Sequence, residues 1–228
     1  MDVGIQEAEW LKTANLEQRL LGNPLYEEPD AESPHGRFAG RPIIARDTPI
    51  NEGVYLGSGE REAIVVDDQK YPKELNSVYK EVLKRQQRLM KKTKGSFKEG
   101  VLTTVFDFVR KKLRYNPQEV EDLVFKLTGS RAGKDRKVTL NHLIRAEVGI
   151  CRHQALLAAY LLERLKNEGY VAGNVSVDRN SIPGLGGHAW VRYQNSKDVV
   201  FVIDPAQNYV GRLDEAPKQG WSYKRPEE

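Results

Sequence analysis

Three side chains in the last third of the chain can together do nucleophilic chemistry: Cys151, His188 and Asp204. A thiol becomes a good nucleophile when it ionises, and its pKa falls at a helix N-terminus. Cys151 opens a segment rich in Ala and Leu, so we expect it at the start of a helix. The unpaired amides of that first turn can also bind a developing oxyanion. The position of Cys151 therefore favours a nucleophile over a structural thiol.

His188 and Asp204 belong to a predicted hairpin whose polar turn spans 194–198. Both residues are equally distant from Ser196, the middle of that turn. In a hairpin of that register they face each other, with Cβ atoms about 4.5–5.5 Å apart. Asp204 would then hold the imidazole in one tautomer and support its charged form. A slip of one residue would turn one partner to the other face of the sheet.

Each of the three residues also has an ordinary explanation when it is taken alone. A single cysteine is by default a small core hydrophobe, a histidine at a strand start is usually a surface or core residue, and an aspartate before a proline usually forms a turn. The combination is hard to explain in that way and predicts a catalytic triad. A metal site of Cys151, His153, His188 and Asp204 is the alternative, but its spacing matches no common zinc pattern. We expect no metal and no cofactor.

The elements that position these residues are predicted from hydrophobic periodicity. Helical spacing indicates helices at 71–90, 100–113, 117–127 and 139–147, and a largely buried helix at 152–168. Short strands are expected at 42–45, 53–56, 63–66, 171–177, 187–193 and 199–203, and a polar loop at 128–137. Helices come first, then a central helix, then an antiparallel sheet. This order predicts an α+β fold.

The chain is expected to hold one catalytic domain with an N-terminal appendage. Residues 5–21 are weakly helical in pattern, and 23–36 hold three prolines, which is typical of a linker or a wrapping arm. We therefore place an arm at 1–36 and the domain at 37–228, with its core at about 97–212. Asn180 and Tyr209 flank the predicted site and are candidates for the cleft.

Composition narrows the classes of function. Of the 228 residues 39% are hydrophobic and 30% charged, as in an ordinary globular protein, and no apolar run approaches the roughly 20 residues of a membrane helix. The first seven residues carry two acids and no apolar core of a signal peptide. The protein is expected to be cytoplasmic, or exported by a route without such a signal.

The net charge of +4 is modest, but part of the positive charge is concentrated. The first basic cluster consists of Lys84, Arg85, Arg88, Lys91, Lys92 and Lys94, and the second of Lys134, Arg136 and Lys137. Such a run is usually a solvated helix face, and no aromatic residues alternate with it, which disfavours nucleic-acid binding. The patch at 84–94 is therefore expected to be a solvated helix face, and docking of an acidic protein partner there is the alternative that accompanies deamidation.

Three short motifs resemble those of the transglutaminase-like superfamily. They are Gly-Ile-Cys-Arg-His-Gln-Ala at 149–155, His188-Ala189-Trp190, and Ile203-Asp204-Pro205-Ala206. Upstream, Lys112-Leu113-Arg114-Tyr115 resembles the helix end and aromatic residue that precede the cysteine motif in that family. The resemblance covers about residues 97–212.

This resemblance implies a papain-like α+β core with Cys151 as nucleophile, His188 as general acid and base, and Asp204 as the orienting group. In enzymes of this family the cysteine attacks an amide carbonyl to form a thioester, which then reacts with water or with an amine. Many microbial members of the family have an acidic residue two positions after the cysteine, where this chain has His153. This difference is expected to alter the rim of the cleft. No pattern of a calcium site is present.

The expected function is a cysteine-dependent hydrolase or acyltransferase acting on amides of a peptide or protein substrate. Peptidase or amidase activity is favoured over crosslinking, because a crosslinker must keep water from its thioester and the sequence shows no feature for this. A protein-glutamine deamidase or transglutaminase is an alternative within the same chemistry. A binding module that keeps the fold without catalysis is the alternative outside it.

Overall fold

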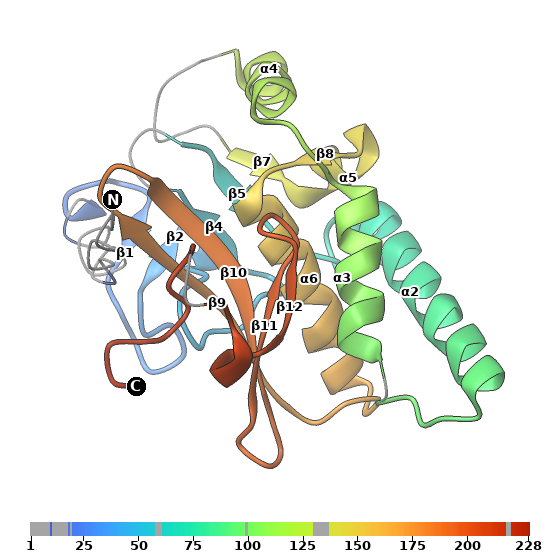
Figure 1. Ribbon diagram of the computed structural model, residues 1–228. Coiled ribbons are helices and arrows are strands. Elements are labelled where there is room, and N and C mark those ends of the chain that lie inside the picture. The colour runs from blue at the N-terminus through green and yellow to red at the C-terminus, as the bar shows by residue number, and fades with distance from the viewer. Residues whose placement is uncertain are drawn as a thin grey trace.

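The computed structural model describes residues 10, 18, 20–57, 61–98, 100–129, 137–217 and 220–228. Within these ranges the chain is a mixed α+β protein with five α-helices and four sheets (Figure 1). A four-stranded sheet packs on the central helix α6, α3 packs on α6, and α2 covers α3. The predicted α+β class is therefore confirmed.

The five helices lie where the hydrophobic spacing predicted them. They are α2 (Pro72–Thr93), α3 (Val101–Lys112), α4 (Pro117–Thr128), α5 (Leu140–Ala146) and α6 (Cys151–Asn167). Cys151 is the first residue of α6, and every residue from Arg152 to Leu162 is buried. Alanine and leucine side chains on all faces of α6 let the surrounding elements pack against it from every side. The helix that carries the thiol is thus fixed by the core.

The sheet beside α6 contains the strands that carry His188 and Asp204. Its order is β12 (Tyr209–Arg212), β11 (Val200–Asp204), β10 (Gly186–Asn195) and β9 (Gly173–Ile182), and all neighbours are antiparallel. Strands β9 and β10 are longer than expected, and β12 was not predicted. Alternate residues feed two cores: Val191 and Ile203 pack with α6, whereas Trp190 and Val202 pack with Tyr223 on the other face.

The register of β10 and β11 corrects the predicted pairing. Val191 lies opposite Ile203 and Gln194 opposite Val200, so the hairpin is centred on Lys197 rather than Ser196. The turn lies further along the chain than predicted, between Asn195 and Val199, and the Asn195 side chain accepts the amides of Lys197 and Val199 at 2.9 and 3.0 Å. The prediction that His188 lies directly opposite Asp204 is therefore wrong. The pairing differs by an even number of positions, however, so both residues remain on one face as diagonal neighbours.

The smaller sheets bring the first half of the chain against this core. Strands β4 (Val54–Leu56), β5 (Ala63–Val65) and β7 (Lys137–Thr139) form one sheet, in which β5 and β7 are parallel. Strand β7 was not predicted: it begins at Lys137, the end of the expected loop, and ends at Thr139, the start of the expected helix. Strand β6 (Arg114–Tyr115) pairs in parallel with β8 (Val148–Gly149), which sets Tyr115 opposite Gly149, just before Cys151.

The third small sheet spans the expected boundary between arm and domain. Strand β1 (Tyr26–Glu27) pairs with β2 (Arg37–Phe38), which pairs with β3 (Arg41–Pro42). The strand expected at 42–45 reduces to β3 and an isolated bridge between Ile43 and Val54. Of the helix expected at 5–21, all but residues 10, 18, 20 and 21 lie outside the described ranges.

Two expectations about the surface can be compared with the structure. Five of the six residues in the basic cluster on α2 are exposed, and the sixth, Arg85, bonds Glu81 at 2.6 Å. Lys134 and Arg136 lie outside the described residues. None of the described helices combines the length and the apolar character that crossing a lipid bilayer requires.

Candidate active site

The structure brings the three predicted site residues together at one cleft. The Nε2 atom of His188 lies 2.5 Å from Oδ2 of Asp204, and the imidazole of His188 lowers the pKa of the Cys151 thiol through hydrogen bonding and charge. Because Asp204 occupies Nε2, Nδ1 is the ring nitrogen left for the thiol. Cys151 is partly exposed to solvent, whereas His188 and Asp204 are buried. Cys151 and His188 line the cleft, and Asp204 lies behind the imidazole.

The first turn of α6 is held by a buried polar cluster beneath Cys151. His153 accepts the amide of Ile150 on Nδ1 at 3.1 Å, and its Nε2 lies 3.0 Å from Oε1 of Glu62. Arg152 donates from Nε to the same oxygen at 2.7 Å. Burial of the ring, the main cause, lowers the pKa of His153 to about 4, so the imidazole is neutral and can accept on one nitrogen and donate from the other. The cluster therefore fixes the position of Cys151 at the start of α6.

The position of His153 overturns one expectation and weakens another. His153 is fully buried, so the prediction that it alters the rim of the cleft is wrong. Its two ring nitrogens bond Ile150 and Glu62, so neither is turned to a shared metal site with Cys151. Across the described ranges no group of three or more His, Cys, Asp and Glu side chains is arranged to hold a metal ion.

The charge states of Cys151 and His188 are set by opposing physical causes. Burial raises the pKa of the Cys151 thiol, but the hydrogen bond and charge of His188, the charge of Arg152 and the amide of Ala189 outweigh it and bring the pKa below its ordinary value. Burial lowers the pKa of His188, but Asp204 and Cys151 outweigh it and raise the pKa to about 9. Both directions favour a thiolate beside an imidazolium near neutral pH.

Asp204 is held by three donors. Besides His188, the hydroxyl of Tyr223 donates to Oδ2 at 2.9 Å, and the amide of Gln207 donates to Oδ1 at 3.1 Å. The carboxylate is fully buried, and such a group is stable as an anion only when its oxygens are satisfied. Tyr223 is therefore a positioning residue for Asp204, and it comes from a segment that the sequence did not connect with the site.

Residues 221–228, the C-terminal strap, cover the His188–Asp204 pair. The ring of Trp221 lies 4.7 Å from that of His188, and its Nε1 donates to Oδ1 of Asn180. Asn180 in turn donates to the carbonyl of Ser222 at 2.8 Å. The hydrogen bond between imidazole and carboxylate thus lies under an aromatic ring, away from bulk water. Shielding of this kind strengthens an electrostatic contact.

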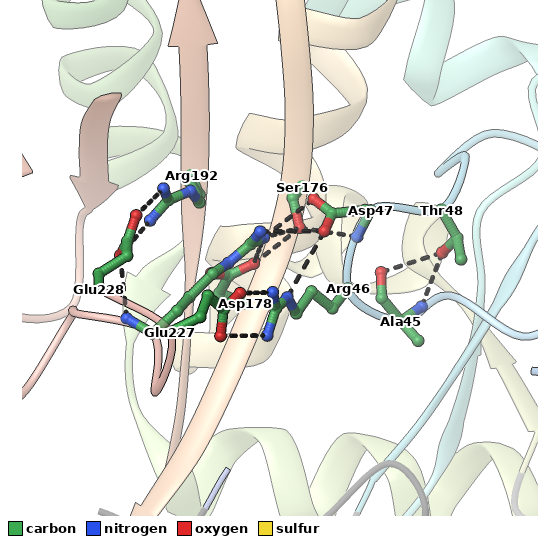
Figure 2. Close-up of polar contacts among 10 residues, drawn as sticks. Ala45, Arg46, Asp47, Thr48, Ser176, Asp178, Arg192, Glu227 and Glu228 are labelled. Carbon is green, nitrogen blue, oxygen red and sulfur yellow. Dashed lines mark hydrogen bonds and ion pairs between the residues drawn. The ribbon is translucent and has the colours of Figure 1, made fainter. Parts of the chain in front are cut away.

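The strap is anchored to β9 by Arg225, which bonds Asp178 of that strand. Its guanidinium donates to both oxygens of Asp178 at 2.8 and 2.7 Å and to both oxygens of Asp47 at 2.9 Å. Asp178 is fully buried, so Arg225 supplies the charge that it needs. At the end of the strap Glu228 bonds Arg192 of β10 (Figure 2). These contacts fix the segment that carries Trp221 and Tyr223.

The cleft above Cys151 has a volume of about 240 Å³. Its walls include Tyr55 and Tyr115, together with Asn180 as expected. Tyr209 does not line it: its ring stacks on Tyr223 at 5.8 Å, and its hydroxyl donates to the carbonyl of Arg212. Burial and then the charge of Cys151 raise the pKa of the half-exposed Tyr115, which places this hydroxyl within electrostatic reach of the thiol.

Sequence reasoning missed four residues of this site: Glu62, Trp221, Tyr223 and Arg225. They act through contacts between segments far apart in the chain, and no short spacing marks them. The available signal was compositional, namely two aromatic residues close to an arginine at the end of a polar segment.

Comparison with known proteins gives no family for this chain. A scan of protein-family models, a search of curated proteins and a search of solved structures returned no match. The likeness to the transglutaminase-like superfamily rests on the motif residues, and membership of that family stays a prediction.

Proposed function

We propose that the protein is a cysteine-dependent hydrolase or acyltransferase with a papain-like core of the transglutaminase-like type. The observation that carries this proposal is the hydrogen-bonded chain of Cys151, His188 and Asp204 at the open end of one cleft. A helix-start thiol, a ring nitrogen and a buried carboxylate in that order are the parts of an activated nucleophile. The substrate is an amide of a peptide or protein.

The first half-reaction forms a thioester. The Cys151 thiolate attacks the amide carbon, and the carbonyl oxygen becomes an oxyanion. The amide of Cys151, which has no acceptor within its own helix, and the Tyr115 hydroxyl are the donors near this oxygen. When the C–N bond breaks, the imidazolium of His188 gives its proton to the leaving nitrogen. An acyl-thioester, a neutral imidazole and a free amine result.

The second half-reaction restores the enzyme. Neutral His188 takes a proton from water while the oxygen attacks the thioester carbon. The C–S bond breaks, the carboxylic acid leaves, and the thiolate and imidazolium are regenerated. Asp204 keeps the imidazole oriented through both steps and supports its charged form.

Hydrolysis is favoured over transfer to an amine by the exposure of the site. Cys151 is partly accessible, and Tyr115 at the rim is 54% exposed, so water reaches the thioester. Deamidation of a glutamine side chain would follow the same steps with ammonia as the leaving group.

The test is to incubate the protein with a tryptic peptide mixture in ¹⁸O-labelled water, with and without added methylamine, and to read the products by mass spectrometry. Peptide cleavage adds ¹⁸O at a new C-terminus, deamidation adds it at a glutamine side chain, and transfer adds the mass of methylamine. Cleavage by the wild type that is absent with Cys151→Ala is the expected result. Equal product spectra for the two proteins would refute catalysis on these peptides.

A further inference from the structure

Arginines are prominent among the described residues that line the cleft. Among the lining residues that the structure describes are Arg61, Arg152 and Arg179, and none is an aspartate or a glutamate. Arginine is the side chain best suited to recognise a carboxylate, because its planar donors match the two oxygens. The charge of these arginines would influence which amide substrates reach the thiol. A substrate preference inferred from them therefore rests on the proposed function.

The three arginines have different roles. Arg152 is buried and bonded to the buried Glu62, so its charge is matched within the protein. Arg61 is exposed at the wall, and no carboxylate in the described ranges lies within ion-pair distance of it. Its charge nevertheless acts on the site, since it opposes the rise in the pKa of Tyr115 and adds to the fall in the pKa of His153, beside larger causes in each.

Arg179 is placed for recognition beside the reacting atoms. It lies on β9 directly opposite Ala189, the residue after His188. Its Nη1 donates to the carbonyl of Leu56 at 2.6 Å, and its guanidinium lies 5.1 Å from the ring centre of Tyr55. These contacts hold the long side chain in one orientation, so little rotamer entropy is left to lose when a ligand binds.

We infer that the acyl donor carries a carboxylate close to the scissile amide, and that Arg61 and Arg179 are the specificity-determining residues that bind it. The carboxylate belongs to an acidic side chain or to a free chain end, and both present the same two oxygens. The cleft therefore disfavours peptides with lysine or arginine at that position, because the guanidinium groups would repel a cation there.

The test compares how fast Cys151 reacts with iodoacetate, an anion, and with iodoacetamide, its neutral analogue. The ratio of the two rates removes differences in intrinsic thiol reactivity. At pH 10 any cysteine is largely ionised and the His188 imidazolium is mostly discharged, whereas the arginines keep their charge. The ratio at that pH reports the field of the cleft wall, whether or not the thiol is activated at neutral pH.

Arg61→Gln and Arg179→Gln are each expected to lower the ratio about threefold to tenfold, as one charge does across several ångströms of a partly solvated cleft. Arg179→Lys keeps the charge and should keep most of the ratio. Arg88→Gln, on the exposed side of α2, is the matched control and should leave the ratio unchanged. If both cleft variants behave like Arg88→Gln, the anionic acyl donor is refuted.

A second set of reagents distinguishes the two sources of the carboxylate. Iodoacetyl-glutamic acid α-amide carries only a side-chain carboxylate, iodoacetyl-glutamine carries only a terminal one, and iodoacetyl-glutamine amide carries neither. The carboxylate source that the cleft binds is the one whose rate advantage over the neutral amide disappears in Arg179→Gln. Failure of the proposed function appears separately, as an ordinary pKa for iodoacetamide alkylation in the wild type.

Discussion

Replacing Asp204 by Asn isolates the electrostatic support of His188. Asparagine keeps the shape of the buried carboxylate and removes its charge. In the wild type the pKa of His188 rises from an ordinary 6.5 to about 9 against the opposing effect of burial. At about 1.4 kcal/mol per unit this difference corresponds to about 3 kcal/mol in favour of the imidazolium. Asp204 and Cys151 supply it together, with the hydrogen bond of Asp204 the largest of the favourable causes.

Asp204→Asn is therefore expected to lower the pKa of His188 by at least about one unit. A hydrogen bond to a charged group a few ångströms away contributes a pKa shift of at least this size in a protein interior. The imidazolium then discharges at a lower pH, and the pKa of the Cys151 thiol rises in turn because its charged partner is less stabilised. The pH range over which thiolate and imidazolium coexist should therefore narrow from both sides, and activity that depends on the pair should fall.

The assay is a pH titration of ¹³C-labelled histidine by NMR. The chain has four histidines, and the resonance of His188 is the one missing from His188→Gln. A wild-type value near 9 that falls in Asp204→Asn is the predicted result. A wild-type value near 6.5, or a value that does not move in the variant, would refute the electrostatic argument.

Three further predictions concern the residues that position the site. Glu62 has a pKa lowered to about 2, because its bonds to His153 and Arg152 outweigh burial; the stability it adds is present above its ordinary value of 4.5 and is lost as pH falls towards 2. Glu62→Gln should therefore cost about 3–5 kcal/mol in urea unfolding at pH 7 and flatten the acid slope, and an unchanged slope would contradict this. Tyr223→Phe should cost about 1–3 kcal/mol, because Asp204 loses a buried donor while its charge stays; thermal unfolding identical to wild type would show that the bond contributes nothing. Arg225→Gln should destabilise the fold by about 3–5 kcal/mol and slow alkylation of Cys151, since it leaves the buried Asp178 without its cation. Its control is Arg46→Gln, which breaks the exposed pair with Glu227 and should cost only about 0–1 kcal/mol; a similar loss in both variants would argue against the strap as the anchor.

The central helix and its sheet were predictable because their signals are local. The Ala- and Leu-rich segment after Cys151 favours a helix by propensity, and its apolar residues on all faces indicate burial before any neighbour is known. The alternation in β10 and β11 likewise predicts two strands. Three residues at the ends of such elements could therefore be placed on one site from the sequence.

The details of that site were less predictable because they depend on side chains in turns. Asn195 accepts two amides of the turn and moves the pairing of β10 and β11 away from symmetry about Ser196. The contact of His188 with Asp204 survived because an even displacement keeps both on one face. A displacement by one residue would have separated them.

Long-range partners left no local signal at all. Glu62 meets His153 across 91 positions, and Arg225 meets Asp47 across 178. Polar pairs of this kind form only when the fold brings two segments together. From the sequence alone, any charged residue in the chain is an equally good candidate for the partner. The burial of His153 was missed for the same reason.

The most direct test of the account is the pH dependence of iodoacetamide alkylation of Cys151 in the wild type and in His188→Ala. The chain has one cysteine, so the reaction reports that thiol alone. The account predicts an apparent pKa below the ordinary value of about 8.5 in the wild type, and a rise in the variant, where the hydrogen bond and charge of the imidazolium are gone. An ordinary or raised pKa that is the same in both proteins would contradict the claim that Cys151 and His188 form an activated pair.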